Sequence, residues 1–121
     1  MRLVIRAMSL QDEPLARTIV CEFDERGGTV GRSDINTLTL PDPGRHISRR
    51  QGEIAFQNGA FCVRNVGSAN PLIVNGHPLL PGEVAPIRDG DDVVIGRYTL
   101  KATVHVSADA KGGQQPFIPR V

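Results

Sequence analysis

Alternation of apolar and polar side chains is the most regular feature of the chain. Between residues 98 and 106 every even-numbered residue is apolar or aromatic, and every odd-numbered residue is polar. A period of two places one set of side chains in a core and the other in solvent, which predicts a half-buried β-strand. Ile19, Cys21 and Phe23 share a face in the same way, and so do Ile54 and Phe56. We therefore expect strands at all three places.

The dipeptide Asn58-Gly59 joins residues 53–57 to residues 60–64. Because asparagine and glycine both tolerate a positive φ, this dipeptide predicts a tight β-hairpin.

Asn75-Gly76 joins Leu72–Val74 to His77–Leu79 and predicts a second hairpin. Pro78 has no N–H to donate, so its strand is expected to lie at the edge of a sheet or to be very short.

Composition agrees with many short elements. The chain has 121 residues, of which 13 are glycine and 9 are proline, and this leaves little room for long helices. The segment 10–17 is interrupted by Pro14, and no amphipathic helix longer than a turn or two is found. A hydrophobic share of 40% and a charged share of 22% indicate a globular chain of one-domain size. Together these features predict an all-β sandwich or barrel.

The alternation stops at Val106. Residues 107–116 have the composition of a linker that buries little apolar area. We therefore expect a domain over residues 1–106 and a flexible C-terminal linker or tail over 107–121. Phe117 and Ile118 could dock on a partner, although a frayed tail is the simpler expectation.

The overall charge is small. Fourteen basic and thirteen acidic residues give a net charge of +1, so a charge-driven function needs a local cluster. Cys21 and Cys62 lie in apolar runs and are expected to be buried free thiols in a reducing compartment. No apolar stretch approaches the roughly 20 residues that span a bilayer, and Arg6 interrupts the apolar start of the chain. The expected location is cytoplasmic, with no membrane insertion.

Candidate chemistry is concentrated in three turns. Gly31-Arg32 follows Thr29-Val30, residues 45–50 are rich in basic side chains, and residues 67–71 form the third turn. A guanidinium offers a fork of donors that matches phosphate oxygens, and a serine hydroxyl adds a short donor. Loops at one end of a sandwich converge, so these turns predict an anion site, most simply for a phosphorylated side chain.

Five short motifs along the chain occur in a fixed order. They are Val30-Gly31-Arg32, Asp34-Ile35 with Thr39-Leu40, Ile47-Ser48-Arg49, Asn70 with Val74-Asn75-Gly76, and Asp89-Gly90-Asp91 with Val94-Ile95-Gly96. This order resembles that seen in forkhead-associated (FHA) domains, and the resemblance covers about residues 2–106. It implies a β-sandwich of about eleven strands that binds phosphothreonine peptides through loops at one end.

Four longer segments, residues 28–34, 40–43, 45–49 and 70–76, carry a finer resemblance. They resemble the N-terminal FHA domain of proteins associated with bacterial type VI secretion. This resemblance implies a threonine-phosphorylation pathway that regulates the secretion apparatus.

The family's binding residues can be transferred to this chain by position. Arg32 would contact the phosphate or the adjacent ligand backbone, Ser48 would hydrogen-bond the phosphate, and Arg49 would add a charged contact. Asn70 would hold the peptide backbone beside the phosphothreonine. Gly31 would shape the turn, and Asn75-Gly76 would be structural. Possible secondary contacts come from Ser33, His46, Arg50 and Ser68. If that stretch is extended, Arg50 is expected to point away from Arg49. For Arg50, pairing with an acid such as Glu53 is an alternative of equal weight to ligand contact.

Three departures from the family pattern affect this site. The family's serine is usually followed three positions later by a loop-bracing histidine; here that position is Gln51, whose amide can still hydrogen-bond, so we expect the loop to hold. Where the family usually has asparagine-glycine-threonine, this chain has Pro71 after Asn70, and proline lacks an N–H. Ala69 lacks the hydroxyl that many relatives direct at the phosphate. Each lost charge-assisted hydrogen bond costs ~1.5–3 kcal/mol, so weaker phosphothreonine binding, or phosphate-independent contacts, could result.

Other function classes are less favoured. His77 and His105 have no ligand-type neighbours at metal spacing, and the acidic residues 89–92 fit a turn better than a Ca²⁺ loop. No nucleophile motif or phosphate-binding glycine loop is present, so no enzyme activity and no cofactor are expected. The predicted function is phosphothreonine-peptide recognition. The alternative is a phosphorylation-independent interaction scaffold of the secretion apparatus, and nucleic-acid binding by residues 45–50 is a remote third possibility.

Overall fold

The computed structural model describes residues 1–68 and 70–106, and this part of the chain is all β. It contains twelve strands and no helix, hence none long and apolar enough to cross a membrane. The expected sandwich is confirmed, with one strand more than the eleven or so anticipated. In chain order the strands are β1 (Arg2–Leu10), β2 (Glu13–Pro14), β3 (Val20–Phe23), β4 (Gly28–Gly31), β5 (Leu38–Thr39), β6 (Gly52–Gln57), β7 (Ala60–Asn65), β8 (Leu72–Val74), β9 (His77–Leu79), β10 (Val84–Ile87), β11 (Asp92–Ile95) and β12 (Tyr98–His105).

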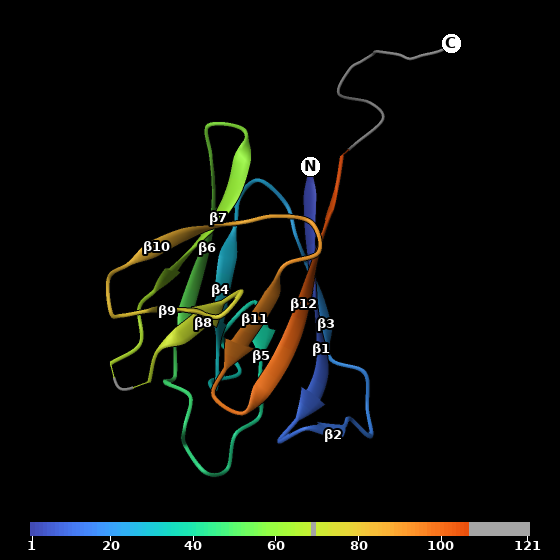
Figure 1. Ribbon diagram of the computed structural model, residues 1–121, viewed down its shortest axis with the longest axis vertical. Helices are drawn as coiled ribbons and strands as arrows, with labels where there is room; N and C mark the ends of the chain where they lie inside the picture. Colours follow the sequence, from blue (N-terminus) through green and yellow to red (C-terminus); the bar gives the residue numbers. More distant parts are fainter. Residues whose placement is uncertain (69, 107–121) are drawn as a thin grey trace.

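The strands form two sheets that face each other (Figure 1). The seven-stranded sheet has the order β2-β1-β12-β11-β8-β9, with β3 also paired to β1. The five-stranded sheet has the order β10-β7-β6-β4-β5, in which β4 and β5 are parallel. The long connection from β5 to β6 and the turn from β11 to β12 lie at one end, and the β6–β7 turn and the N-terminus lie at the other (Figure 1). The strand β9, which contains Pro78, lies at a sheet edge as predicted.

The apolar side chains that alternate along β12 pack into the core, as the sequence predicts. Tyr98, Leu100 and Ala102 are buried, while the intervening residues are more exposed. Their partners on β1 are Leu10, Ala7 and Ile5, respectively, so the two longest strands supply one wall of the core.

Both Asn-Gly dipeptides form the predicted hairpin turns. Asn58 and Gly59 have φ values of 54° and 80°, and Asn75 and Gly76 have values of 49° and 82°. Two successive positive φ angles define the turn that matches the right-handed twist of the flanking strands.

The prediction that both cysteines are buried is wrong in degree, because both thiols are only half-buried and both are free. Cys62 alternates with the buried Phe61 and Val63 and so faces outward. Cys21 faces the core side, but its strand, β3, is at an edge, and its thiol lies 3.4 Å from the carbonyl oxygen of Thr37. Burial raises the pKa of the Cys21 thiol, which disfavours the reactive thiolate.

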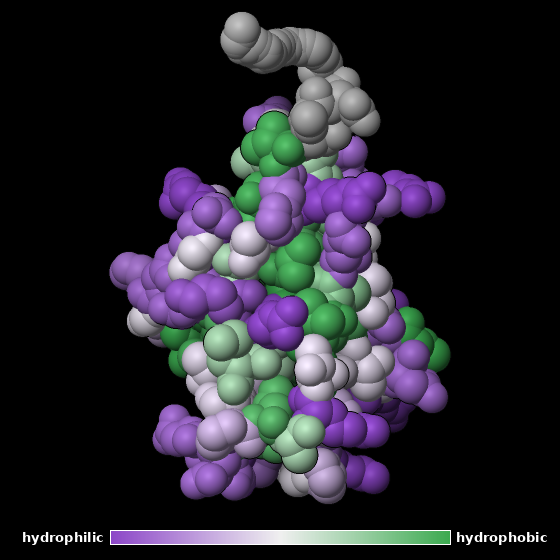
Figure 2. All heavy atoms as spheres, turned by 90° about the vertical axis from the view of Figure 1, so that its right-hand side faces the viewer, coloured by the Kyte–Doolittle hydropathy of each residue, from purple (hydrophilic) through white to green (hydrophobic). Residues whose placement is uncertain are grey.

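The outer surface beside β1 and β3 mixes hydrophobic and charged side chains (Figure 2). Met8 and Val20 are exposed there, and Val20 pairs in register with the exposed Arg6. Charged side chains therefore interrupt the apolar surface on this face.

One side-chain bond ties the β5–β6 connection to the larger sheet. The hydroxyl of Tyr98 donates to the carbonyl oxygen of Pro41 at 2.6 Å. Burial, together with the nearby Asp42 carboxylate, raises the pKa of Tyr98 above its ordinary value of 10.0. The fold thus favours the neutral phenol, and the stability that this provides is present below about pH 10 and is lost as pH rises through the higher folded-state pKa.

Tyr98→Phe should lower the free energy of unfolding at pH 7 by about 1 kcal/mol, because one buried acceptor loses its donor. It should also flatten the loss of stability above about pH 10. Urea unfolding at pH 7 and in the alkaline range measures both effects. Tyr98 is the only tyrosine, so tyrosinate absorbance in the native protein reports its titration directly. An ordinary phenol pKa in the folded protein would contradict this account.

Candidate functional site

Two loops that are distant in sequence are joined through their backbones at one end of the sandwich. The N–H of Arg32 donates to the carbonyl oxygen of Ser48 at 3.1 Å, and the N–H of Ser33 donates to that of Arg49 at 3.2 Å. These bonds extend beyond the β4–β6 ladder, which ends at Val30 and Gly52. They place the guanidinium-bearing loop directly against the serine-bearing loop.

Gly31 permits this close approach. A Cβ atom at position 31 would overlap the carbonyl oxygen of Arg49 and come within 2.9 Å of the Cα of Arg50. Only glycine therefore fits, which agrees with the predicted role of Gly31 in shaping the turn.

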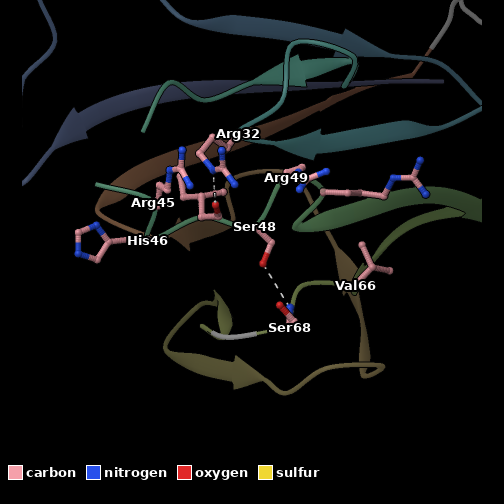
Figure 3. A pocket seen from close by; sticks show the side chains of 9 residues that line it. Arg32, Arg45, His46, Ser48, Arg49, Val66 and Ser68 are labelled. Atoms are coloured by element: carbon pink, nitrogen blue, oxygen red, sulfur yellow. Dashed lines mark hydrogen bonds between the residues drawn. The ribbon is translucent and has the colours of Figure 1, made fainter. Parts of the chain in front are cut away.

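The two loops enclose a hollow of about 460 Å³ (Figure 3). Arg32 lies above Ser48, Arg45 and His46 lie on one side, Arg49 lies on the other, and Ser68 lies opposite the Ser48 hydroxyl. The residues that line the hollow are Arg32, Arg45, His46, Ile47, Ser48, Arg49, Arg50, Val66 and Ser68. The phosphate-contacting trio of the sequence prediction is therefore brought together.

The hollow is cationic and lacks acidic lining residues. None of its four arginines forms a salt bridge with any carboxylate of residues 1–68 and 70–106. In particular, the alternative pairing of Arg50 with Glu53 is not formed. Arg50 lines the same hollow as Arg49, and residues 49 and 50 form a bend and not the extended stretch on which the expected opposite direction depended.

Arg32 and Ser48 are both oriented by backbone groups. The Nε of Arg32 donates to the carbonyl oxygen of Ile47 at 3.0 Å, which leaves the two terminal nitrogens of the guanidinium for a ligand. The Oγ of Ser48 accepts the N–H of Ser68 at 3.2 Å (Figure 3). Because that oxygen already accepts a bond, its own proton can be donated into the hollow.

Gln51 braces the serine loop, as expected from its amide. Its Oε1 accepts the N–H of Ser48 at 2.9 Å, and its Nε2 donates to Asn65 Oδ1 at 2.9 Å and to the carbonyl oxygen of Asn70 at 3.0 Å. The side chain is only 1% exposed, so all three bonds are shielded from water. Gly67 leaves room for it, because a Cβ there would overlap the Gln51 amide.

Asn36 is a second residue that braces the loops, and the sequence analysis did not identify it. Its Nδ2 donates to the carbonyl oxygens of Ser33 at 2.7 Å and of Arg49 at 2.6 Å, so one buried amide links both loops of the hollow. In the sequence, Asn36 looks like an ordinary turn residue, and only its near-complete burial distinguishes it. Ser33 serves the same loop, since its hydroxyl accepts the N–H of Ile35 and does not line the hollow.

Asn70 belongs to a neighbouring groove rather than to the hollow. This groove of about 180 Å³ is lined by Asn70, Pro71, Ile73, Val94, Gly96, Arg97 and His46, and His46 is shared with the hollow. The Nδ2 of Asn70 donates to the carbonyl oxygen of His46, so part of the amide is already used within the protein. Ala69, the other departure from the family pattern, lies outside the described residues, as does the predicted tail of 107–121.

Asp42 was also missed by the sequence reasoning. Its Oδ2 accepts the N–H of Ile47 at 2.6 Å, and its Oδ1 lies 3.7 Å from His46 Nδ1. It fixes the loop that carries the basic residues. Among the residues that the structure describes, no cluster of three or more metal-ligating side chains occurs. In the acidic turn at 89–92, Asp91 accepts the N–H of Arg88, Asp89 accepts the N–H of Val104, and Asp92 pairs with Lys101.

Comparisons with known proteins identify the family. The FHA domain model matches residues 28–96, and the chain belongs to the FHA domain family. It is 31% identical over 90 residues to the glycogen accumulation regulator GarA of Mycolicibacterium smegmatis, covering 74% of this chain and 54% of that protein. It is 37% identical over 78 residues to the oxoglutarate dehydrogenase inhibitor of Corynebacterium diphtheriae, covering 64% of this chain and 51% of that protein. The chain thus spans about half the length of the curated relatives it matches.

Solved structures share the fold. A structure described as concerning phosphothreonine-dependent FHA domain interactions superposes with a TM-score of 0.70 at 23% identity, covering 88% of this chain and 100% of that one. The FHA domain of the CT664 protein from Chlamydia trachomatis superposes with a TM-score of 0.71 at 17% identity and the same coverages. At these identities the likeness establishes the sandwich and not the ligand.

Gln51→Leu should destabilise the domain by about 2–4 kcal/mol. Leucine has a similar volume but cannot hydrogen-bond, so the Ser48 N–H, Asn65 Oδ1 and the Asn70 carbonyl oxygen each lose a buried partner. Gln51→His should retain most of the stability. Urea unfolding measures the difference, and Gln57→Leu at the exposed end of β6 is the control, with an expected change below about 0.5 kcal/mol. Equal effects of Leu at both positions would refute the bracing role.

Proposed function

We propose that this chain is a phosphothreonine-peptide recognition domain. The observation that carries the proposal is the hollow in which the Arg32 guanidinium and the Ser48 hydroxyl converge without a neighbouring carboxylate. Arg32, which forms no salt bridge with the described carboxylates and is held by the carbonyl oxygen of Ile47, is arranged to receive an anion. A phosphorylated side chain supplies both the charge and the acceptor oxygens that such a site needs.

Each proposed contact uses a hydrogen-bond donor that is not already bonded within the protein. The terminal nitrogens of Arg32 can bind two phosphate oxygens as a fork, and the Ser48 hydroxyl can donate to a third. Arg49 adds charge from the opposite side of the hollow (Figure 3). The site is largely preorganised, because Gln51 and Asn36 hold both loops through buried hydrogen bonds.

Asn70 is proposed to contact the ligand's backbone where the hollow meets the second groove. Its Oδ1 remains as an acceptor for a peptide N–H, while its Nδ2 is partly engaged by His46. Pro71 cannot add a backbone donor there. We therefore expect fewer contacts to the peptide backbone than an asparagine-glycine sequence would allow, with the arginines supplying most of the affinity.

The partner and the pathway in which this domain acts are a separate part of the proposal. The partner is proposed to be a cytoplasmic protein that a kinase phosphorylates on threonine. The type VI secretion context rests on the sequence motifs alone, whereas the relatives above are named for regulation of glycogen accumulation and oxoglutarate dehydrogenase. The phosphorylation-independent scaffold remains the alternative for the same experiment to decide.

Titration of a threonine-phosphorylated peptide library against its unphosphorylated twin tests the proposal. Binding should require the phosphate and should weaken as salt is raised, because screening reduces the attraction between the charges. Arg32→Ala should weaken binding about 10- to 100-fold and Ser48→Ala about 10-fold, as expected for lost hydrogen bonds to a charged group.

Arg88→Ala is the matched control, since Arg88 is exposed in the β10–β11 connection and does not line the hollow. Thermal melting of each variant shows whether the loops remain folded. Equal binding of both libraries would refute phosphothreonine recognition and favour the scaffold. Tight binding to random duplex DNA with a steep salt dependence would instead indicate a nucleic-acid ligand.

A further inference from the structure

The outer face of the five-stranded sheet presents two ordered rows of side chains. The registers of β10, β7, β6 and β4 set residues directly opposite one another, and such residues point to the same face of the sheet. One row is Val84, Arg64, Glu53 and Thr29, and the next is Pro86, Cys62 and Ala55. All of these residues are exposed or half-buried, and none lines the hollow of the proposed phosphothreonine site. The face is therefore a separate surface.

Two opposite charges on this face are without an ionic partner. Glu53 and Arg64 are opposed across β6 and β7, yet within residues 1–68 and 70–106 neither forms a salt bridge, with the other or with any third group. Arg64 instead donates from Nη1 to the carbonyl oxygen of Gly82 at 3.2 Å, just before β10. The face thus carries an unpaired anion and an unpaired cation in the same row.

The two sides of the face differ in shape. Val84 and Pro86 are exposed on the edge strand β10, and Val84 is 47% exposed. On the other side, a hollow of about 410 Å³ lies at β4 and β6, with Thr29, Glu53 and Ala55 among its lining residues. One side of the face is therefore an exposed apolar strip, and the other side is concave.

A second copy of the chain matches both features. A two-fold axis that runs parallel to the strands, between β6 and β7, places β7 of one copy over β6 of the other and β10 over β4. Along the first row, Arg64 of one copy then opposes Glu53 of the other, and Val84 opposes the hollow at Thr29. Because the operation is two-fold, every contact occurs twice, as an isologous interface requires. Packed sheets lie about 10 Å apart, a gap that arginine and glutamate side chains bridge together.

We propose that the outer face of the five-stranded sheet binds a second copy of this chain in a two-fold dimer. Two reciprocal Arg64–Glu53 ion pairs and two contacts between the β10 strip and the β4–β6 hollow hold the copies together. Pairing of two β10 edges is disfavoured, because Pro86 removes a backbone donor from that strand. The interface goes beyond the proposed function and does not depend on it.

The size of the face sets the strength of the dimer. Four strands, of which β6 and β7 have 6 residues each, cover roughly 20 Å by 20 Å, or about 400 Å² per copy. A standard interface buries about 800 Å² per partner. The dimer is therefore transient, and it forms at high protein concentration.

Charge reversal followed by mixing tests the dimer. Glu53→Arg and Arg64→Glu should each lower the association constant about tenfold or more, because like charges then oppose each other across the axis. A Glu53→Arg copy carries only cations at the two positions, and an Arg64→Glu copy carries only anions. An equimolar mixture of the two variants should therefore associate at least as strongly as the unchanged chain. Sedimentation equilibrium over a range of concentrations measures the association of each sample.

Glu13→Arg and Arg17→Glu are the matched controls, since both residues are exposed and lie outside the five-stranded sheet. Both controls should leave the association constant unchanged. Like charges on neighbouring strands lower stability, so thermal melting checks that each variant is folded. Val84→Lys disrupts the apolar strip without that repulsion from Glu53 or Arg64 being altered, and it should also lower association about tenfold or more.

Cys62 gives a measurement on the unchanged chain. It lies in the second row, within the proposed interface, whereas the other free thiol, Cys21, lies on β3 in the other sheet. Alkylation of Cys62 should slow relative to that of Cys21 as the protein concentration rises.

Three results would overturn the dimer. They are a monomer mass for the unchanged chain at every concentration, an association that charge reversal does not weaken, and variants that remain monomeric when mixed. A constant ratio of the two alkylation rates would overturn it as well.

Discussion

Two segments, residues 31–33 and 48–50, are hydrogen-bonded to each other at the end of the smaller sheet, and the site depends on this contact. The β4–β6 ladder brings the segments together, and two further backbone bonds, from Arg32 to Ser48 and from Ser33 to Arg49, continue the contact beyond the last strand residues. Gly31 allows the approach because no side chain intervenes. The position of the guanidinium relative to the hydroxyl is therefore set by the backbone and not by side-chain flexibility.

Buried side-chain amides hold these two segments in place. Gln51 satisfies groups from three different segments, and Asn36 links the two loops directly. Such bonded polar groups cost little in the core, and they hold the backbone of the loops that carry the cationic side chains. Four of the fourteen basic residues line the hollow and no acidic residue does, which is how a protein with a net charge of +1 can present a strongly positive hollow.

Much of the fold could be predicted from the sequence because its signals are local. The alternation in β12 and the Asn-Gly hairpins depend on neighbouring residues alone, and both appear as expected. The convergence of Arg32 with Ser48 was predicted from the expected clustering of loops at one end of a sandwich and from the family resemblance, and not from local pattern. The roles of Asn36 and Asp42, the left-handed backbone at Arg45 and the position of Asn70 in a separate groove were not predicted. Each of these depends on which distant backbone groups lie nearby, and that information is absent from a single stretch of sequence. The half-exposure of Cys21 has the same origin, since it depends on β3 lying at a sheet edge.

A crystal structure of the chain with a bound phosphothreonine peptide tests the central claim most directly. The account predicts that the phosphate occupies the hollow, within hydrogen-bonding distance of both the Arg32 guanidinium and the Ser48 hydroxyl, with the two loops unchanged in backbone. A phosphate bound at another surface, or a peptide bound with its phosphate in solvent, would contradict it.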